Sequence, residues 1–299
     1  METLDTLGKR IATTRDLQSI VRTMKTLSTV SIRQYERAVI ALHDYDRTIE
    51  LGLQIVLREK AVPAEESVRP DAPAAAIVFG SDHGLCGRFN EQIGRFAVTE
   101  MQKRNWPTGP WLAVGNQAAT RLEAAGQTID AGFALPGAVT GLTSLANSIL
   151  LKIDEWRTGS GVARVMLFHN ARVGETTASP FAHQLLPFHT GWLERLARLP
   201  WRSRALPTHT MGQQALFSAL VREHLFVTIF RAAAESMASE HATRLASMQA
   251  AERNIKEHLD EMNSAYHQRR QQAITEELLD IVAGFETFRV AETSGEEIT

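Results

Sequence analysis

The sequence predicts an α/β protein with unusually long helices: an antiparallel coiled coil of the N- and C-terminal helices, plus a central Rossmann-like α/β domain. Three compositional zones predict this organisation. Residues 4–60 contain no proline and only two glycines, and residues 211–285 are almost free of helix breakers. Between them, residues 74–207 consist of short apolar runs separated by glycine and proline, which is typical of alternating strands and helices.

The N-terminal zone carries a repeat with alternating steps of three and four residues, which is the spacing of a coiled-coil seam. The repeat comprises Tyr35, Ala38, Leu42, Tyr45, Ile49, Gly52 and Val56, with Leu17, Ile20, Met24, Leu27 and Ser31 in the same rhythm upstream. We therefore predict a coiled-coil helix over residues 1–60. The following "AVPAEESVRPDAPAAA" contains three prolines and predicts a linker over residues 61–73.

The C-terminal zone has the same rhythm. Its repeat comprises Leu245, Met248, Glu252, Ile255, Leu259, Met262 and Tyr266, and then, after a one-residue slip, Ile274, Leu278, Ile281 and Phe285. We predict a coiled-coil helix over residues 208–286 and a tail over 287–299. Each helix is expected to bury its stripe on the other, with the longer C-terminal helix projecting beyond its partner.

The central zone, residues 74–207, reads as strands and helices in alternation. The strand candidates are "AAAIVFG", "PWLAVG", "ARVMLFHNAR" and "FAHQLLPF". The helix candidates are "NEQIGRFAVTEMQKRN", "NQAATRLEAAG" and "GLTSLANSILLKIDEWRTG". This alternation predicts a largely parallel sheet with helices on its faces.

Bulk properties exclude several classes of protein. No stretch approaches the ~20 consecutive apolar residues of a membrane span, and the first residues lack the apolar core of a signal peptide. The single cysteine, Cys86, excludes an internal disulfide and a Cys-rich metal site. A formal net charge of −2 argues against a nucleic-acid binder. We expect a cytoplasmic protein that does not itself insert into the membrane.

The turn "GSDHGLCGRFN", residues 80–90, lies between a predicted strand and a predicted helix. It matches neither the G-x-x-x-x-G-K-[ST] nor the G-x-G-x-x-G phosphate cradle. A nucleophilic Cys86 beside His83 is one interpretation, although no third, orienting group can be assigned. The other interpretation is a structural turn in which Gly84, Cys86 and Gly87 pack backbone against backbone.

Two charged segments are candidates for interfaces. The first helix is rich in Lys and Arg, including Arg10, Arg22 and Lys25, which indicates either a solvated face or contact with an acidic protein surface. The segment "RRQQAITEE" clusters hydrogen-bonding side chains on a helix that is expected to be longer than its partner helix. Such a segment suits an interface with another subunit.

Three motifs resemble those of the gamma subunits of F-type ATP synthases. They are "TLGKRIATTRDLQSIVRTMKTLSTV" near the N-terminus, "GSDHGLCGRFN" in the central domain and "RQQAITEELLDIVAG" near the C-terminus. The chain departs from the usual pattern at His83, Arg88 and Phe285, and in "MKTLSTVSIRQ". These departures indicate a divergent lineage, such as the second, often sodium-linked type of bacterial F-ATPase.

The resemblance implies a rotor shaft that carries no catalytic residue, cofactor or metal of its own. The C-terminal helix would enter a ring of alpha and beta subunits, and the α/β domain would sit with the epsilon subunit on the membrane ring of c subunits. Rotation driven by ion flow would then power ATP synthesis. ATP hydrolysis would drive rotation in the opposite direction. The expected location is the cytoplasmic face of the bacterial plasma (inner) membrane, as a peripheral protein.

The resemblance also assigns residues. Met24, Arg270, Gln271 and Thr275 align with positions that contact beta, and Arg10, Arg22 and Lys25 would approach an acidic stretch of beta. Small residues in "RAAAESMASEHATRLAS" would keep the shaft slender inside the ring. Two rival hypotheses remain: a coiled-coil scaffold outside any ATPase, and an α/β enzyme with helical extensions.

Overall fold

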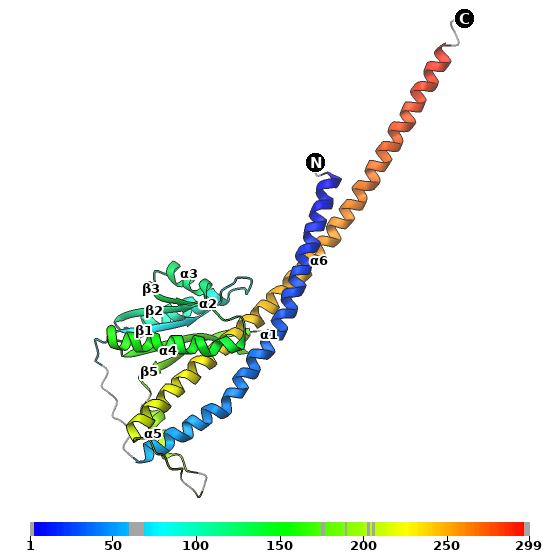
Figure 1. Cartoon of the computed structure of the whole chain (residues 1–299). Coiled ribbons are helices and arrows are strands. Elements are labelled where there is room, and N and C mark those ends of the chain that lie inside the picture. Colours follow the sequence, from blue (N-terminus) through cyan, green and yellow to red (C-terminus); the bar gives the residue numbers. More distant parts are fainter. Residues whose placement is uncertain are drawn as a thin grey trace. The chain divides into compact units, whose positions relative to one another are not determined.

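The computed structural model describes residues 3–59, 69–174, 177–188, 190–201, 204 and 207–295. The chain divides into two compact units, Met1–Lys25 with Met248–Thr299, and Thr26–Ser247. Two long helices contribute to both units: α1 (Leu4–Glu59) and α6 (Gln213–Gly295) (Figure 1). The predicted coiled coil is therefore divided between the units. Residues 61–68 of the predicted linker and 296–299 of the predicted tail lie outside the described residues.

Helix α6 is longer than the sequence predicts. It continues through Gly284 to Gly295 and so takes in most of the segment that we expected to be a tail. The physical reason is that a single glycine inside a helix costs only about 1 kcal/mol. No proline follows Gly284 to end the helix.

The central domain is built on a five-stranded sheet in the order β3-β2-β1-β4-β5. The strands are β1 (Ala74–Phe79), β2 (Thr108–Val114), β3 (Ile129–Phe133), β4 (Arg164–Val173) and β5 (Thr177–Leu186). Three neighbouring pairs are parallel and only β4 and β5 pair antiparallel, which confirms the prediction of a largely parallel sheet. The sequence missed β3, because its five residues alternate between partly buried and exposed positions and form no apolar run.

Helices cover both faces of the sheet, as Figure 1 shows. Helices α2 (Phe89–Arg104) and α3 (Asn116–Ala124) pack on the face that presents Ala76 and Val78. Helix α4 (Leu142–Gly159), preceded by the 3-10 turn η1 (Val139–Gly141), packs on the opposite face together with α6. This doubly wound arrangement is the Rossmann-like architecture that the sequence predicts.

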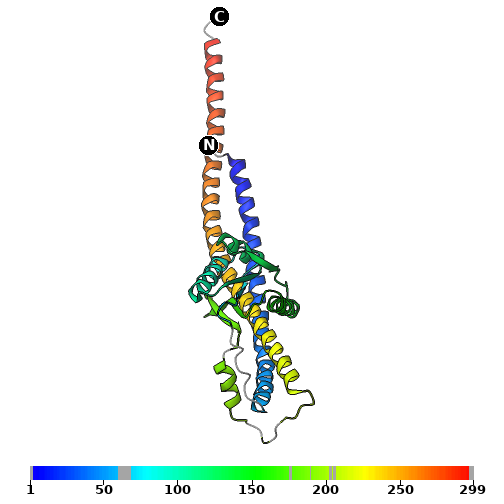
Figure 2. The same ribbon diagram turned by 90° about the vertical axis from the view of Figure 1, so that its left-hand side faces the viewer.

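A short helix, α5 (Thr190–Arg198), was not predicted. It lies beside the end of α1 in Figures 1 and 2. Leu193 and Leu196 of α5 pack with Ile49, Leu53 and Leu57 of α1. Its nine residues form a strongly amphipathic helix, but they are too few for the periodicity to stand out in the sequence.

The small residues of α6 pack against the sheet of the α/β domain. Ala232, Ala233, Ala234 and Ala238 are buried in the core that α6 shares with the sheet and α4. All belong to the unit Thr26–Ser247. The role of this segment in a slender shaft inside a ring stays a prediction. The small side chains allow α6 to lie close to the sheet.

In the unit formed by the chain ends, α1 and α6 run antiparallel. Leu7 and Ile11 pack against Leu259, and Tyr266 approaches Gly8. The predicted C-terminal stripe is confirmed there, because Met248, Ile255 and Leu259 are among its buried or partly buried positions.

The upstream N-terminal stripe is wrong at three of its five positions, whereas Met24 and Ser31 are partly buried. Leu17, Ile20 and Leu27 are 50%, 55% and 61% exposed. The inward positions of this part of α1 include polar residues such as Gln18 and Lys25, which are half-buried. Apolar periodicity therefore selected the outer face of the helix. In the part of the chain that the structure describes, no helix combines the length and the apolar character that a membrane crossing requires.

A larger side chain at Ala234 tests the close packing of α6. Ala234 is fully buried, so Ala234→Leu should overpack the core and lower the free energy of unfolding by about 1–3 kcal/mol. Urea denaturation followed by circular dichroism measures this. Ala273→Leu, at an exposed position of the same helix, is the control and should change stability by less than ~0.5 kcal/mol. Equal effects at the two positions would contradict the packing argument.

Candidate functional site: a clamped turn and the exposed end of helix α6

The turn at residues 80–90 is held together by a buried side-chain network. The Ser81 backbone N–H donates to Asn90 Oδ1 at 2.9 Å, and Asn90 Nδ2 donates to Ser81 Oγ at 2.7 Å. Cys86 Sγ lies 3.5 Å from Asn90 Nδ2 and 3.6 Å from Ser81 Oγ. Asn90, in the first turn of α2, therefore ties the start of that helix to the end of β1.

Two glycines allow neighbouring backbones to meet at this turn. A Cβ atom at Gly80 would lie 2.5 Å from Ala118 Cβ and 2.6 Å from Asn90 Oδ1. Gly115 has φ +100°, and a Cβ atom there would lie 2.7 Å from the Ser81 carbonyl. Only glycine fits such close approaches. The close packing at this turn therefore involves Gly80 and Gly115.

The first turn of α3, beside this loop, is satisfied by the protein itself. Asp82 Oδ1 accepts from the Asn116 N–H at 3.0 Å, and the Ser81 carbonyl accepts from the Gln117 N–H at 2.9 Å. Asp82 Oδ2 also accepts from the Leu135 N–H at 2.7 Å. Backbone N–H groups at such a helix start can bind a phosphate, but here protein oxygens already occupy them.

Helix α6 clamps the turn through a buried ion pair. Arg244 Nη2 donates to Glu240 Oε1 at 2.6 Å, and the two side chains are 8% and 7% exposed. The same guanidinium group donates to the carbonyls of His83 and Gly84 at 3.4 and 3.3 Å. One buried arginine thus joins α6 to the loop that follows β1.

The clamp lies where α/β proteins usually bind ligands. In a doubly wound sheet, ligands bind beyond the carboxyl ends of the strands at the point where the strand order reverses, here between β1 and β4. In this chain the Arg244 side chain reaches the loop at the end of β1. The crevice of a dinucleotide-binding fold is thus used to attach a helix.

Burial controls the protonation of this cluster. Desolvation raises the pKa of Glu240, with the Arg244 charge opposing the rise. Desolvation also raises the pKa of the Cys86 thiol, so Cys86 is protonated at neutral pH and is a poor nucleophile. Among the described residues, no group of three or more His, Cys, Asp or Glu side chains is arranged to hold a metal ion. Cys86 is buried in the turn, and Gly87 has φ +58°, a conformation that favours glycine. A Cβ atom at Gly84 would meet no atom within 4 Å, and one at Gly87 would meet only side chains, so the expectation that these two glycines pack backbone against backbone is wrong.

Two of the cations assigned to an acidic partner have an acidic neighbour inside the chain. Lys25 Nζ lies 2.6 Å and Arg22 Nε 3.1 Å from the Glu252 carboxylate. The hydrogen bond from Lys25, followed by that from Arg22, lowers the pKa of Glu252. Arg10 is exposed on α1, and Met24 is half-buried on the same helix.

The residues assigned to the beta contact lie together at the exposed end of α6. Arg270, Gln271 and Thr275 are all exposed, and Thr275 Oγ1 donates to the Gln271 carbonyl at 2.9 Å. Exposed apolar side chains surround them, namely Ile274, Leu278, Leu279, Ile281 and Val282. The structure thus brings these three residues together on one short stretch of helix, whereas Met24 belongs to the other helix.

Sequence reasoning missed the residues of α6 that hold the domain. Glu240 and Arg244 stand four residues apart within a run of small side chains, and that spacing of opposite charges could have indicated a buried pair. His241, between them, stacks on Tyr35 with ring centroids 5.8 Å apart. Nothing in the local sequence of Tyr35 indicates this contact.

The chain is similar to known proteins in sequence and in structure. The model of the family described as ATP synthase matches residues 3–288. The chain therefore belongs to the ATP synthase family. Over 97% of its length it is 26% identical to the whole ATP synthase gamma chain of Geotalea uraniireducens (strain Rf4) and 29% identical to that of Synechococcus sp. (strain PCC 6716).

Solved structures share the fold. A chain of the Euglena gracilis mitochondrial ATP synthase, from a structure of OSCP, F1 and c-ring in rotational state 3, matches with a TM-score of 0.66 at 16% identity. The match covers 97% of this chain and 95% of that one. A chain of the Tetrahymena thermophila mitochondrial ATP synthase, from a structure of the central stalk and c-ring, matches with a TM-score of 0.54 at 18% identity. That match covers 78% of this chain and 99% of the other.

Breaking the clamp on one side tests its contribution to stability. Arg244→Met should lower the free energy of unfolding by about 3–5 kcal/mol, because it leaves Glu240 buried without a cation. Glu240→Met combined with Arg244→Met should restore part of this loss. Lys9→Met is the control, since its ion pair with Asp5 is more than three-quarters exposed and is worth less than ~1 kcal/mol. A double variant no more stable than Arg244→Met would contradict the argument.

His241 should make the protein sensitive to acid. Burial, followed by the charge of Arg244, lowers the pKa of His241 from 6.5 to about 4. As the pH falls from 6.5 to about 4, the unfolded chain takes up a proton that the folded chain refuses, so stability falls by at most roughly 1.4 kcal/mol per pH unit. Between pH 6.5 and about 4, the urea midpoint of the wild type should fall relative to that of His241→Phe. Parallel curves would disprove the assignment.

Proposed function

We propose that this chain is the central-stalk rotor (gamma) subunit of an F-type ATP synthase. It would couple transmembrane ion flow, through rotation of the c-ring, to ATP synthesis or hydrolysis on the beta subunits. The observation that carries the proposal is the C-terminal end of α6, which presents apolar side chains beyond the reach of α1.

Helix α1 begins at Leu4, and Gly8 is already beside Tyr266. In an antiparallel pair, the residues of α6 after about position 270 therefore have no turn of α1 beside them. Ile274, Leu278 and Leu279 there are 48%, 57% and 62% exposed. Contiguous exposed apolar side chains mark a binding surface. A cavity inside a surrounding ring of subunits would cover them.

The angular positions on the helix support a role for the predicted contact residues. At 100° per residue, the apolar residues from Ile274 to Val282 span an arc of roughly 160°. Gln271 and Thr275 fall within this arc and Arg270 at its edge, whereas Glu276 lies on the opposite, acidic side. Arg270, Gln271 and Thr275 would thus face beta together with the apolar side chains.

The mechanism would be mechanical. A partner shifts a conformational equilibrium only through different contact energies with the different states. A rotating asymmetric shaft would give three chemically identical beta subunits three different sets of contacts at any moment. The chain itself would be non-catalytic. In keeping with this, Asp82 accepts from the first turn of α3 and Arg244 donates to the loop after β1, so protein groups occupy both places.

The α/β domain would form the foot of the rotor, in contact with the c-ring and the epsilon subunit. Torque applied to the domain would reach the shaft through α6, to which Arg244 and the small-residue core attach it. The protein would lie peripherally on the cytoplasmic face of the bacterial plasma membrane. Met24 and the basic residues Arg10, Arg22 and Lys25 would approach beta from α1, with Arg22 and Lys25 also paired to Glu252.

Reconstitution tests the function directly. The chain is mixed with alpha and beta subunits purified from the same cells, the complex is sized, and steady ATP hydrolysis is measured with and without the chain. One copy per three alpha and three beta subunits, with altered multisite turnover, is the expected result. A chain that associates only with itself, in the presence of folded alpha and beta, would indicate a scaffold instead.

The contact residues make a sharper test. Replacement of Arg270, Gln271 and Thr275 by alanine should reduce ATP turnover of the reconstituted complex about tenfold, equivalent to ~1.4 kcal/mol of coupling. Glu276→Gln, in the same segment on the acidic side, is the matched control and should retain turnover. A chain that ends before Arg270 should reduce ATP turnover more than the triple variant does. Equal turnover in the triple variant and the control would refute the assigned contact.

A further inference from the structure

The unit Thr26–Ser247 contains a second feature that the rotor function does not use. A cavity of about 720 Å³ lies among β4, β5, α5, the start of α6 and the facing turns of α1. We call it the α5 cavity. Its apolar lining includes Leu167, Leu185, Phe188, Trp192 and Leu225. Its volume is within the ~300–1,000 Å³ typical of small-molecule sites.

Most charged groups around the α5 cavity already have a partner within the chain. Arg231 Nη2 lies 2.5 Å from Asp46 Oδ2, and His224 Nδ1 lies 3.6 Å from Asp46 Oδ1. His169 Nε2 lies 3.0 Å from Glu235 Oε2. Arg231 thus compensates the charge of the Asp46 carboxylate, and His169 is a hydrogen-bond partner of the Glu235 carboxylate.

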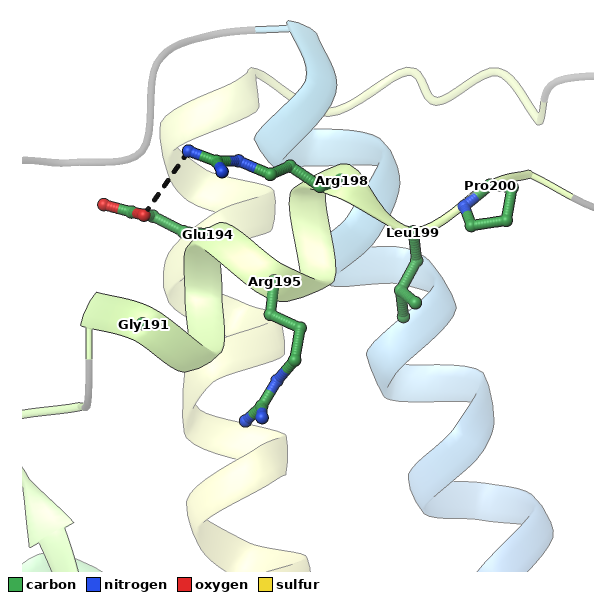
Figure 3. A pocket seen from close by; sticks show the side chains of 6 residues that line it. All are labelled: Gly191, Glu194, Arg195, Arg198, Leu199 and Pro200. Atoms are coloured by element: carbon green, nitrogen blue, oxygen red, sulfur yellow. Dashed lines mark ion pairs between the residues drawn. The ribbon is translucent and has the colours of Figure 1, made fainter.

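Two lining residues of opposite charge have no such partner. Among the described residues, neither Arg195 of α5 nor Glu50 of α1 makes a side-chain hydrogen bond or an ion pair. Figure 3 shows Arg195 pointing away from the ion pair that Glu194 and Arg198 form on the same helix. The α5 cavity therefore offers one free guanidinium and one free carboxylate from different helices.

An aromatic wall lies at the same cavity. The rings of Trp192 and His224 stack with centroids 4.6 Å apart, and Phe188 lies 6.0 Å from Trp192. Aromatic walls favour flat apolar groups, which stack on them or meet them edge to face. The lining thus combines a flat apolar surface with a cationic and an anionic group.

We propose that the α5 cavity binds a small zwitterionic aromatic molecule with the chemistry of a free aromatic amino acid. The carboxylate of the ligand pairs with Arg195, whose planar guanidinium group matches a carboxylate with two parallel hydrogen bonds. The ammonium group of the ligand pairs with Glu50. The aromatic ring lies against Trp192 and Phe188.

The smaller neighbouring cavity does not share these properties. It has a volume of about 370 Å³ and is lined by Gly191, Glu194, Arg195, Arg198, Leu199 and Pro200 (Figure 3). Its acid is already paired, since Arg198 Nη2 lies 3.6 Å from Glu194 Oε2. It also has no aromatic wall. A zwitterionic aromatic ligand therefore fits the α5 cavity and not this one.

Three related compounds test the proposal by isothermal titration calorimetry on the full-length chain. The probes are L-tryptophan, tryptamine, which lacks the carboxylate, and indole-3-propionate, which lacks the ammonium group. L-Tryptophan should bind about tenfold more tightly than either analogue, since each charged hydrogen-bonded contact is worth ~1.4 kcal/mol or more. No binding of any probe at millimolar concentration, or equal binding of all three, would overturn the proposal.

Variants assign the two charges. Arg195→Gln should weaken the binding of L-tryptophan and indole-3-propionate about tenfold and leave the binding of tryptamine unchanged. Glu50→Gln should weaken the binding of L-tryptophan and tryptamine only. Arg198→Gln is the matched control. Arg198 lies on the same helix as Arg195, but it pairs with Glu194 and does not line the α5 cavity. Circular dichroism checks that each variant is folded. Affinities in Arg195→Gln that equal those in Arg198→Gln would refute the site.

Discussion

The structure depends on the close packing of α6 against the α/β domain. Small side chains at Ala232, Ala233 and Ala234 let the helix lie near the sheet, and Arg244 then reaches the loop after β1. A larger residue in this run would separate the two surfaces and leave the Glu240–Arg244 pair without its carbonyl partners. Close approach and the buried ion pair are thus one constraint, since the ion pair is well satisfied only when the helix lies close.

This constraint explains why a fold associated with nucleotide binding has none of the usual motifs. The glycines of a phosphate cradle bring backbone N–H groups towards an anion. Here Gly80 and Gly115 bring backbone towards backbone, and Asp82 satisfies the start of α3. In this chain, the place where a dinucleotide-binding fold holds its ligand holds a helix. In a rotor, such an attachment would have to resist torque, which a network of buried hydrogen bonds and packed small residues can do.

The long helices and the order of most strands could be predicted from the sequence, because proline-free stretches and apolar runs are local signals. The phase of the seam could not be predicted where polar residues line it. Leu17, Ile20 and Leu27 have the right spacing, yet they face outward while Gln18 and Lys25 are half-buried. Periodicity reports that a helix has an apolar face but not which neighbour covers that face. The packing of the small residues of α6 against the sheet could not be predicted for the same reason, since composition does not tell which surface the helix approaches.

The candidate site shows the same limit more sharply. Arg270, Gln271 and Thr275 could be singled out because they share one short segment with a recognisable pattern. In the Glu240–Arg244 clamp, Arg244 donates to the carbonyls of His83 and Gly84, which lie about 160 positions earlier in the chain. The sequence does not show which backbone carbonyl accepts such a hydrogen bond. Arg195 and Glu50 have no side-chain partner among the residues that the structure describes, and only a three-dimensional arrangement can establish this. Interactions that depend on one segment can thus be derived from sequence, and those that depend on the meeting of several require the fold.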